Sequence, residues 1–552
     1  MSDDTTRYLC AASYLDPGFG TRAIKEFLVE PTRPVPASPG IDTGRVLTEA
    51  VRARARRKNY DAILVLLMAV VASLSWDNVL LYAWIVLSVL LVAARAGKTA
   101  YATQRTFNPK TLVVIGFSVV AVWLLVTYSD VLFDDDRSRY AARYEDYYDE
   151  SSGGDTARLV VGIVLAVVVL VVVTIERWSL WNLLTTRFKR FAPPAPDTGS
   201  LTGAFTEDFR EQLARFRRDD EFAGVPGAPL VVYRGYNPFV GAGFRRAAWS
   251  MAIPLERVED VPESRPELTT EALYEGIRTA IGNLRNSSAL SPDRRLAGLT
   301  VTEAVFTPAA ELIDHLAEPE AAAYLPDIER PPQTRLTEGH VGQLRTEPKE
   351  WARYYLCFQV ETWDRELVLT TFLHVAVDDT TLYVEWTPFM LPPVKAEYRA
   401  VDKMRPDSLR PFGQGLLAWL EMPASLPVRI ANLASWIRRP GREPGVLDPD
   451  RYGTAKTLRE LGSVNLFTDY FQLVDIERYE KIIESRLLPA IGKLLGDAGF
   501  STAKFDEQAA VVINNDITIE GDNRAPITQT GVRGDRRRRP PGKPEDATRT
   551  EA

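Results

Sequence analysis

Three long apolar stretches, separated by charged residues, most constrain what this chain can fold into. They occupy residues 61–95, 111–133 and 158–176 of a sequence of 552 residues. A helix needs about 20 mostly apolar residues to cross the ~30 Å hydrocarbon layer of a bilayer. These lengths therefore predict an integral membrane protein.

The first stretch decides the predicted number of crossings. As one continuous helix it would be about 50 Å long at 1.5 Å per residue, which is too long for one crossing without extreme tilt. Trp76, Asp77 and Asn78 interrupt it with residues that favour a turn. The pattern predicts a hairpin of two short spans, 61–75 and 79–95, with a re-entrant loop or one tilted span containing a buried Asp77 as the alternatives.

Basic residues at the ends of these stretches set the predicted orientation, because Lys and Arg concentrate on the cytoplasmic side of membrane proteins. They flank the first stretch on both sides and follow the last one, so both termini are expected in the cytoplasm. The predicted fold is an α-helical bundle of four spans, at about 61–75, 79–95, 111–133 and 158–176, plus a cytoplasmic α+β domain. The predicted membrane-interface residues on these flanks are Arg52, Arg54, Arg56, Arg57, Trp178 and Trp181.

The predicted domain organisation follows from these spans. Residues 1–60 form a cytoplasmic N-terminal segment, 61–190 the transmembrane domain, 200–510 the α+β domain, and 511–552 a tail with a short β motif and a disordered basic end. An external loop at 134–157 is rich in acidic residues and tyrosine. It is either a cation-binding or sensing loop, or an ordinary solvated loop.

Alternation of apolar and polar residues predicts the sheet of the α+β domain. Residues 354–361 alternate with a period of two, and tight turns join the strand at 351–363 to the extended segments 366–377 and 381–386, which predicts an antiparallel meander. Residues 473–498 have apolar positions three and four apart and predict a helix. Its apolar face packs either on its own domain or in a coiled-coil dimer.

The segment 414–439 has a basic amphipathic pattern towards its end. Trp436 lies beside Arg438 and Arg439, and such a helix can lie in the membrane interface. The alternative is a helix that packs on the sheet. Trp436, Arg438 and Arg439 are therefore further membrane-interface candidates.

Composition limits the classes of function. A net charge of −7 argues against a nucleic-acid-binding protein. Cys10 and Cys357 are the two cysteines, too few for a disulfide framework or a cysteine-rich metal site. No cleavable signal peptide is expected, since the first residues are acidic and lack an apolar core.

Motifs for cofactors, metals and catalysis are weak. Gly97, Lys98 and Thr99 lack the preceding glycine of a phosphate-binding loop, and the three histidines are too far apart in sequence for a local metal site. We expect no cofactor and no metal, and the catalytic residues stay unknown. If the protein is an enzyme, its candidate residues near the meander are His374, Asp378, Asp379 and Glu385.

Two resemblances follow from longer segments. VVYRGYNPFVGAGFRRAAWSMAIPL and RELVLTTFLHVAVDDTTLYVEWTPFMLPPV resemble a group of uncharacterised actinobacterial multi-pass membrane proteins with a cytoplasmic domain, a resemblance that implies no activity. The tail segment ITIEGDN resembles the RHIM-like amyloid motifs of bacterial defence signalling proteins, in which a β-arch drives assembly. The matching residues are Ile517, Ile519, Gly521 and Asn523, with an asparagine spacing short by one and an unfavourable Pro526.

The sequence as a whole predicts a bacterial membrane protein that presents a large cytoplasmic binding or regulatory domain. Its expected partners are the lipid bilayer and either another protein or a second copy of the chain. A membrane-associated enzyme with an unrecognised site, and a signalling protein that assembles through its tail, are the two alternative functions.

Overall fold

The computed structural model describes residues 4–34, 41–75, 79–103, 152–192, 227–258, 265–364, 366–435, 447–464 and 469–514, with a few isolated positions besides. The helices are α1 (Asp4–Leu15), α2 (Pro17–Phe27), α3 (Thr43–Leu74), α4 (Val79–Thr103), α8 (Ser152–Arg187), α10 (Thr270–Gly282), α11 (Ala309–Asp314), α12 (Glu338–Thr346), α13 (Ala396–Arg399), α14 (Arg410–Leu420), α15 (Met422–Ala434), α16 (Leu458–Gly462), α17 (Tyr470–Asp497) and α18 (Ala503–Asn514). Short 3-10 helices are η3 (Asn283–Leu290), η4 (Pro292–Gly298), η5 (Pro319–Ala323), η6 (Ala400–Lys403) and η7 (Pro449–Arg451). The strands are β1 (Ala228–Tyr233), β2 (Phe244–Arg245), β3 (Trp249–Pro254), β4 (Thr300–Pro308), β5 (Arg335–Leu336), β6 (Arg353–Thr362), β7 (Leu367–Val377) and β8 (Thr381–Leu391).

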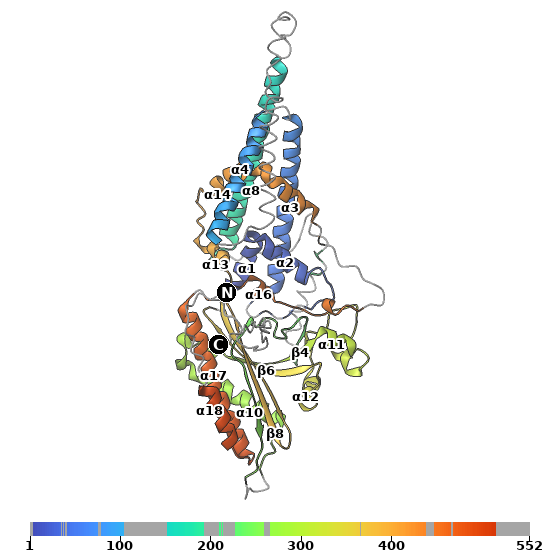
Figure 1. Cartoon of the computed structure of the whole chain (residues 1–552), viewed down its shortest axis with the longest axis vertical. Coiled ribbons are helices and arrows are strands. Elements are labelled where there is room, and N and C mark those ends of the chain that lie inside the picture. The colour runs from blue at the N-terminus through green and yellow to red at the C-terminus, as the bar shows by residue number, and fades with distance from the viewer. Residues whose placement is uncertain are drawn as a thin grey trace, which may run out of the picture.

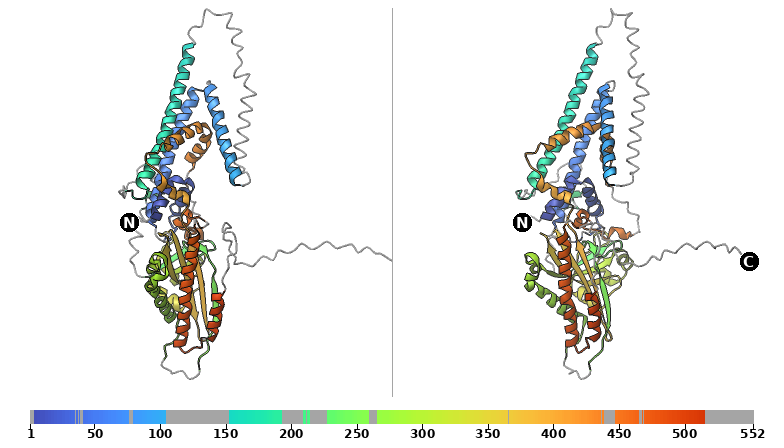
Figure 2. Two further views of the ribbon diagram at one scale, coloured as in Figure 1. Left: turned by 90° about the vertical axis from the view of Figure 1, so that its left-hand side faces the viewer. Right: turned by 60° about the vertical axis from the view of Figure 1, so that its left-hand side comes forward.

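The molecule is elongated, with a stalk of helices above a sheet domain (Figure 1). The stalk consists of α3, α4 and α8, and the helices α14 and α15 pack across it. The helices α1, α2 and α16 lie at its base, between the stalk and the sheet. Figure 2 shows the same division from two other sides.

The sheet is mixed and has eight strands in the order β2-β8-β7-β6-β4-β1-β5, with β3 also paired to β8. The consecutive strands β6, β7 and β8 pair antiparallel, as a meander. One pair is parallel, because β1 lies beside β4 with Leu230 opposite Val305. The meander is therefore one part of a larger sheet that also contains strands from distant parts of the sequence.

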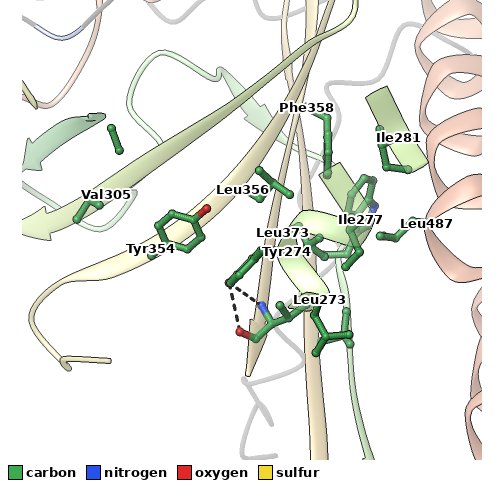
Figure 3. Close-up of a cluster of buried hydrophobic side chains, with 14 of the residues drawn as sticks. Leu273, Tyr274, Ile277, Ile281, Val305, Tyr354, Leu356, Phe358, Leu373 and Leu487 are labelled. Atoms are coloured by element: carbon green, nitrogen blue, oxygen red, sulfur yellow. Dashed lines mark hydrogen bonds between the residues drawn. The ribbon is translucent and has the colours of Figure 1, made fainter. Parts of the chain in front are cut away.

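The main core lies between one face of the sheet and the helices α10 and α17. Leu356, Phe358 and Leu373 of the sheet and Ile277 of α10 are fully buried there, and Figure 3 shows how they converge with Leu487 of α17. The Tyr274 hydroxyl is also buried in this core. It accepts a hydrogen bond from the N–H of Val375 at 3.0 Å and donates one to the carbonyl of the same residue at 3.2 Å (dashed lines in Figure 3).

The helix α17 uses its apolar face within the chain. The positions that define its three-four spacing are buried against α10 and the sheet, namely Ile476, Tyr479, Ile483, Leu487 and Ile491. The same face is therefore not free to form a coiled coil with a second copy. Pro489 lies inside the helix.

The N-terminal helices form a second core at the base of the stalk. Leu9 and Phe19 are fully buried with Tyr398 and with Leu458 of α16. A partly buried hydrogen bond adds to this core, because the Tyr398 hydroxyl donates to the Asp16 carboxylate at 2.8 Å. The first 60 residues thus join the stalk to the sheet domain.

The predicted four-span bundle is wrong. Within the described residues, Val160–Arg187 is the one helix long and apolar enough to cross a membrane, and Leu80–Arg95 is a shorter apolar helix. The segment 61–75 is no separate span, since α3 runs without a break from the arginine-rich part into the apolar part. The segment 111–133 lies outside the described residues. A change of side-chain polarity does not end a helix, because the backbone hydrogen bonds continue through it.

Candidate membrane-facing site

The stalk helices carry apolar side chains on their outer faces. In a water-exposed helix the outer face is polar, and a large exposed apolar patch marks a surface that binds a partner or a membrane. On α8 the exposed residues recur at helical spacing along its length. The exposed large apolar residues of the stalk are Ile63, Leu66, Val70 and Leu74 of α3, Leu80, Leu87 and Leu90 of α4, and Val160, Val161, Ile163, Val164, Val167, Val168, Val171, Ile175 and Trp178 of α8.

A cluster of polar side chains from α3, α8 and α15 lies where these apolar faces end. We call it the polar collar, and it consists of Arg56, Lys58, Asp61, Glu176, Ser179, Arg429 and Asn432. No charged residue follows Asp61 on α3, and none precedes Glu176 on α8 as far back as Leu159. The collar therefore marks a boundary between a charged and an apolar half of the stalk.

Asp61 is the centre of the collar. Its two carboxylate oxygens accept hydrogen bonds from Arg429 and, at 2.5 Å, from the amide of Asn432, both on α15. Arg429 also lies 3.9 Å from the Glu176 carboxylate of α8. The three charged side chains are between 11% and 14% exposed. A buried cluster of this kind holds α3, α8 and α15 together, because loss of one partner leaves another buried charge unpaired.

Basic side chains of α3 also bind the C-terminal end of α15. The Lys58 ammonium group donates to the carbonyl oxygens of Ser435 at 2.8 Å and Leu433 at 3.3 Å, and Arg54 donates to that of Ser435 at 2.8 Å. These contacts satisfy carbonyls that have no partner within the helix and complement the negative end of its dipole. Burial, together with the positive charge of Arg54, lowers the pKa of Lys58.

The helices α14 and α15 pack on the apolar half of the stalk. The Trp419 indole donates to the carbonyl of Ala166 on α8 at 2.9 Å, and the Trp84 indole of α4 donates to the carbonyl of Trp419 at 3.1 Å. Met422 is fully buried in a cluster with Leu64 and other residues of α3, α4 and α8. The helix α15 therefore packs on the stalk and not on the sheet, and it ends at Ala434.

A small residue permits the close approach of α14 to α8. A Cβ atom placed on Gly415 would lie 2.9 Å from the Cα of Thr174, whereas one on Gly413 would meet nothing within 4 Å. Small residues at such crossings let two helix backbones come together in membrane proteins. The crossing depends on Gly415 and not on the neighbouring glycine.

Alanine substitution tests this crossing. We expect Gly415→Ala to cost about 1–3 kcal/mol because it overpacks a backbone contact. The control Gly413→Ala should stabilise the helix by up to about 1 kcal/mol, since alanine has the higher helix propensity. Thermal unfolding of the two purified variants in the same detergent measures the difference. Equal midpoints would contradict the close packing of α14 on α8.

Most of the predicted membrane-interface residues that the structure describes contact other groups of the protein, and Trp178 faces outward. Arg56 donates to the Ser179 hydroxyl within the collar, and Arg52 donates to Glu49 at 2.6 Å. Trp178 is half exposed, whereas Trp181 is buried and its indole donates to the carbonyl of Arg405 at 2.9 Å. Arg54 donates a hydrogen bond to the carbonyl of Ser435, and Arg57 donates to the carbonyls of Ala53 and Ser13. Trp436, Arg438 and Arg439 lie outside the described residues.

The predicted catalytic candidates do not form one site. His374 and Glu385 are opposite one another on β7 and β8. Asp378 lies in the turn beyond, where its carboxylate accepts bonds from the N–H groups of Thr380 and Thr381 at 2.7 Å each. These bonds lower the pKa of Asp378 and account for it as a turn residue. Asp379 lies in the same turn, about 13–17 Å along the strand from His374 at 3.3 Å per residue.

His374 is held by the backbone. Its Nδ1 lies 3.0 Å from the carbonyl oxygen of Tyr354, which can only accept, so Nδ1 carries the proton. Burial lowers the pKa of His374, which favours the neutral ring. Glu385 accepts from the Tyr355 hydroxyl at 3.3 Å. The histidine and the glutamate are therefore both bound by neighbouring residues of the sheet.

Cys10 and Cys357 are both buried, and burial raises the pKa of each thiol far above its usual range. Thiolate is the form that reacts with maleimides. We therefore expect no labelling of the folded protein by a charged maleimide and labelling of both residues after denaturation in SDS, measured by intact mass. Labelling of either cysteine in the folded state would contradict this packing.

Several important residues of the site were not predicted. They are Asp61, Glu176, Arg429 and Asn432 of the collar, and Gly415 and Trp419 of the crossing helix. One signal was present for Arg429, because it is one of two charged residues between Pro411 and Ala434. A lone charge in a long apolar segment usually has a buried partner.

The predicted assembly motif of the tail does not fall within the described residues. Ile517, Ile519, Gly521 and Asn523 lie outside them. No group of three or more His, Cys, Asp or Glu side chains placed to hold a metal ion occurs in the part of the chain that the structure describes.

The fold and the site define a class of protein that combines an apolar helical stalk with a mixed α+β sheet domain. The family model for an AbeC-like domain matches residues 248–526, which is half of the chain. The chain belongs to the AbeC-like domain family. No curated protein and no solved structure matches it.

The matched region is not a separate structural unit. It includes α14 and α15, which pack on the stalk, and it begins after β1. The strand β1 nevertheless lies inside the sheet, between β4 and β5. The AbeC-like domain of this chain is therefore completed by segments that precede it in the sequence.

Proposed function

We propose that this protein is anchored in a membrane by its stalk and presents its sheet domain, which forms most of the AbeC-like region, to the cytoplasm as a binding or regulatory domain. One observation carries the proposal: the outer face of α8 is apolar from Val160 to Ile175, and no charged residue occurs on α8 between Arg158 and Glu176. Contact with lipid is favourable for such an apolar face, whereas contact with water is not.

The orientation is inferred from the base of the stalk. The arginine-rich part of α3 and the end of α8, with Arg177, Arg187 and Arg190, lie on the side of the sheet domain. Positive residues next to a membrane segment favour the cytoplasmic side. The sheet domain, the N-terminal helices and the described end of α18 would therefore all lie in the cytoplasm.

Protease protection tests the orientation. A protease added to intact cells should leave the sheet domain uncut, and the same protease added to sealed inverted vesicles should digest it. A periplasmic marker and a cytoplasmic marker control the integrity of both preparations. Digestion of the sheet domain in intact cells would contradict the proposed orientation.

No observation in the described residues favours the enzymatic alternative. The hydrogen bonds of Asp378 are those of a turn residue, and His374 and Glu385 remain a single pair of cross-strand neighbours. Assembly through the tail stays a prediction. Removal of residues 515–531 should abolish self-association if that prediction is correct, and light scattering of the purified protein would measure it.

A further inference from the structure

We propose that α14 and α15 form a re-entrant hairpin that inserts into the leaflet next to the sheet domain, with lipid acyl chains covering its outer face. This inference rests on the proposed membrane anchorage of the stalk. It concerns a segment inside the AbeC-like domain, far in sequence from α8.

The distribution of side chains on the hairpin is the reverse of that of a water-exposed helix. Phe412 and Leu416 of α14 are 50% and 48% exposed, and Val428 and Ile430 of α15 are 72% and 51% exposed. Arg429, the one charged residue of α15, points inward and is 13% exposed. A helix in water turns its charges outward, whereas a helix in lipid turns them towards its protein neighbours.

The other charge of the hairpin is also paired. Glu421, between the two helices, forms an ion pair with Arg95 of α4 and is 19% exposed. Arg95 is half exposed, and its guanidinium group contacts the Glu421 carboxylate. Every charge between Pro411 and Ala434 therefore has a partner on the stalk.

Contacts along α8 set the depth of the hairpin. Gly415 is level with Thr174, close to the collar, and the Trp419 indole reaches Ala166. Ala166 lies roughly 15 Å from Glu176 along the helix at 1.5 Å per residue. The hydrocarbon layer is ~30 Å thick, so the hairpin stays within one leaflet. In Figure 1 the two helices arch across the stalk at this level.

The outer face of the hairpin continues that of the stalk. The helix α14 packs against α8 and α15 packs against α3 and α4, and all five helices carry exposed apolar residues. One occupant, the acyl layer, covers all of these faces at once. A second copy of the chain would have to match each of them separately.

Single cysteines measure the accessibility of the hairpin in sealed inverted vesicles. Leu416→Cys and Val428→Cys place a thiol on its outer face, Val167→Cys places one on α8, and Leu290→Cys, at a residue 50% exposed, is the control on the sheet domain. The native cysteines provide a silent background. A charged, membrane-impermeant maleimide is the probe, and labelling after SDS denaturation, less that of the two native cysteines, gives the total for each introduced cysteine.

We expect at least a tenfold slower labelling of the cysteines at 416, 428 and 167 than of the one at 290. Fast labelling at 416 and 428 with protection at 167 would overturn the hairpin and leave the anchor intact. Fast labelling at 167 as well would overturn the anchor. Mild oxidation is the second measurement, and disulfide-linked dimers through the cysteine at 428 would assign this face to a second copy and overturn the lipid-covered hairpin.

Discussion

Lysine at both Val167 and Val171 is expected to remove the protein from the membrane fraction. The two residues are about half exposed and lie on one face of α8. Each lysine near the centre of a membrane helix costs about 2.5–3.5 kcal/mol, so the double variant loses about 5–7 kcal/mol of insertion free energy before the side chains adapt. Fractionation of cells that express the variant, with an immunoblot of pellet and supernatant, measures the loss.

The matched control is leucine at the same two positions, which keeps the face apolar and should leave the protein in the pellet. If the stalk were exposed to water, the lysine substitutions would have little effect. Surface substitutions of a soluble helix usually change stability by less than about 0.5 kcal/mol. If the lysine variant behaved as the leucine variant does, α8 would not face lipid at this level.

Asp61→Ala is expected to destabilise the protein by about 3–5 kcal/mol, because it leaves the buried Arg429 without the carboxylate that it contacts on α3. Asn432 loses its acceptor as well. The melting temperature of the detergent-solubilised protein should fall, and α15 should become sensitive to protease before the sheet domain unfolds.

A double variant is the control for this prediction. Asp61→Leu combined with Arg429→Met removes both charges of this pair and keeps side chains of similar shape, and Glu176, 3.9 Å from Arg429, loses only that more distant contact. Replacement of a buried ion pair by apolar residues is often neutral or stabilising. We expect the double variant to recover most of the lost stability. If the single and double variants melted at the same temperature, the pair would not connect α3 with α15.

Local patterns in the sequence were sufficient for part of the sheet domain. The strands β6, β7 and β8 and the helix α17 have strong periodic signals and lie close to the predicted ranges. The pairing of β1 with β4 and β5 was not predictable in the same way. Strand pairing over long separations depends on how the whole sheet packs, and no local periodicity records it.

The four-span prediction failed because it treated each apolar stretch as an independent helix. In the structure α3 and α8 are longer than their apolar parts, and the charged part of α3 binds the N-terminal helix α1 through Arg57 and the end of α15 through Lys58. The boundary predicted at residue 60 falls inside α3. Hydropathy locates a polarity boundary, whereas the ends of a helix depend on capping and packing.

The site itself was only partly predictable. The arginines before Asp61 were predicted to lie at the membrane interface, but most of them bind other groups of the protein. The packing of α14 and α15 on the stalk needs Gly415, Trp419 and Arg429, which lie more than 200 residues after α8. Amphipathicity identifies the apolar face of such a helix but not the surface that it packs against.

Alkaline extraction tests membrane anchorage most directly. Membranes from cells that express the whole chain are washed with sodium carbonate at high pH, which removes proteins held by charge or by other proteins, and are then treated with a mild detergent. We predict that the protein stays in the carbonate pellet and enters the supernatant only with detergent. Release by carbonate alone would mean that the apolar faces of α8 and its neighbours are covered by something other than lipid.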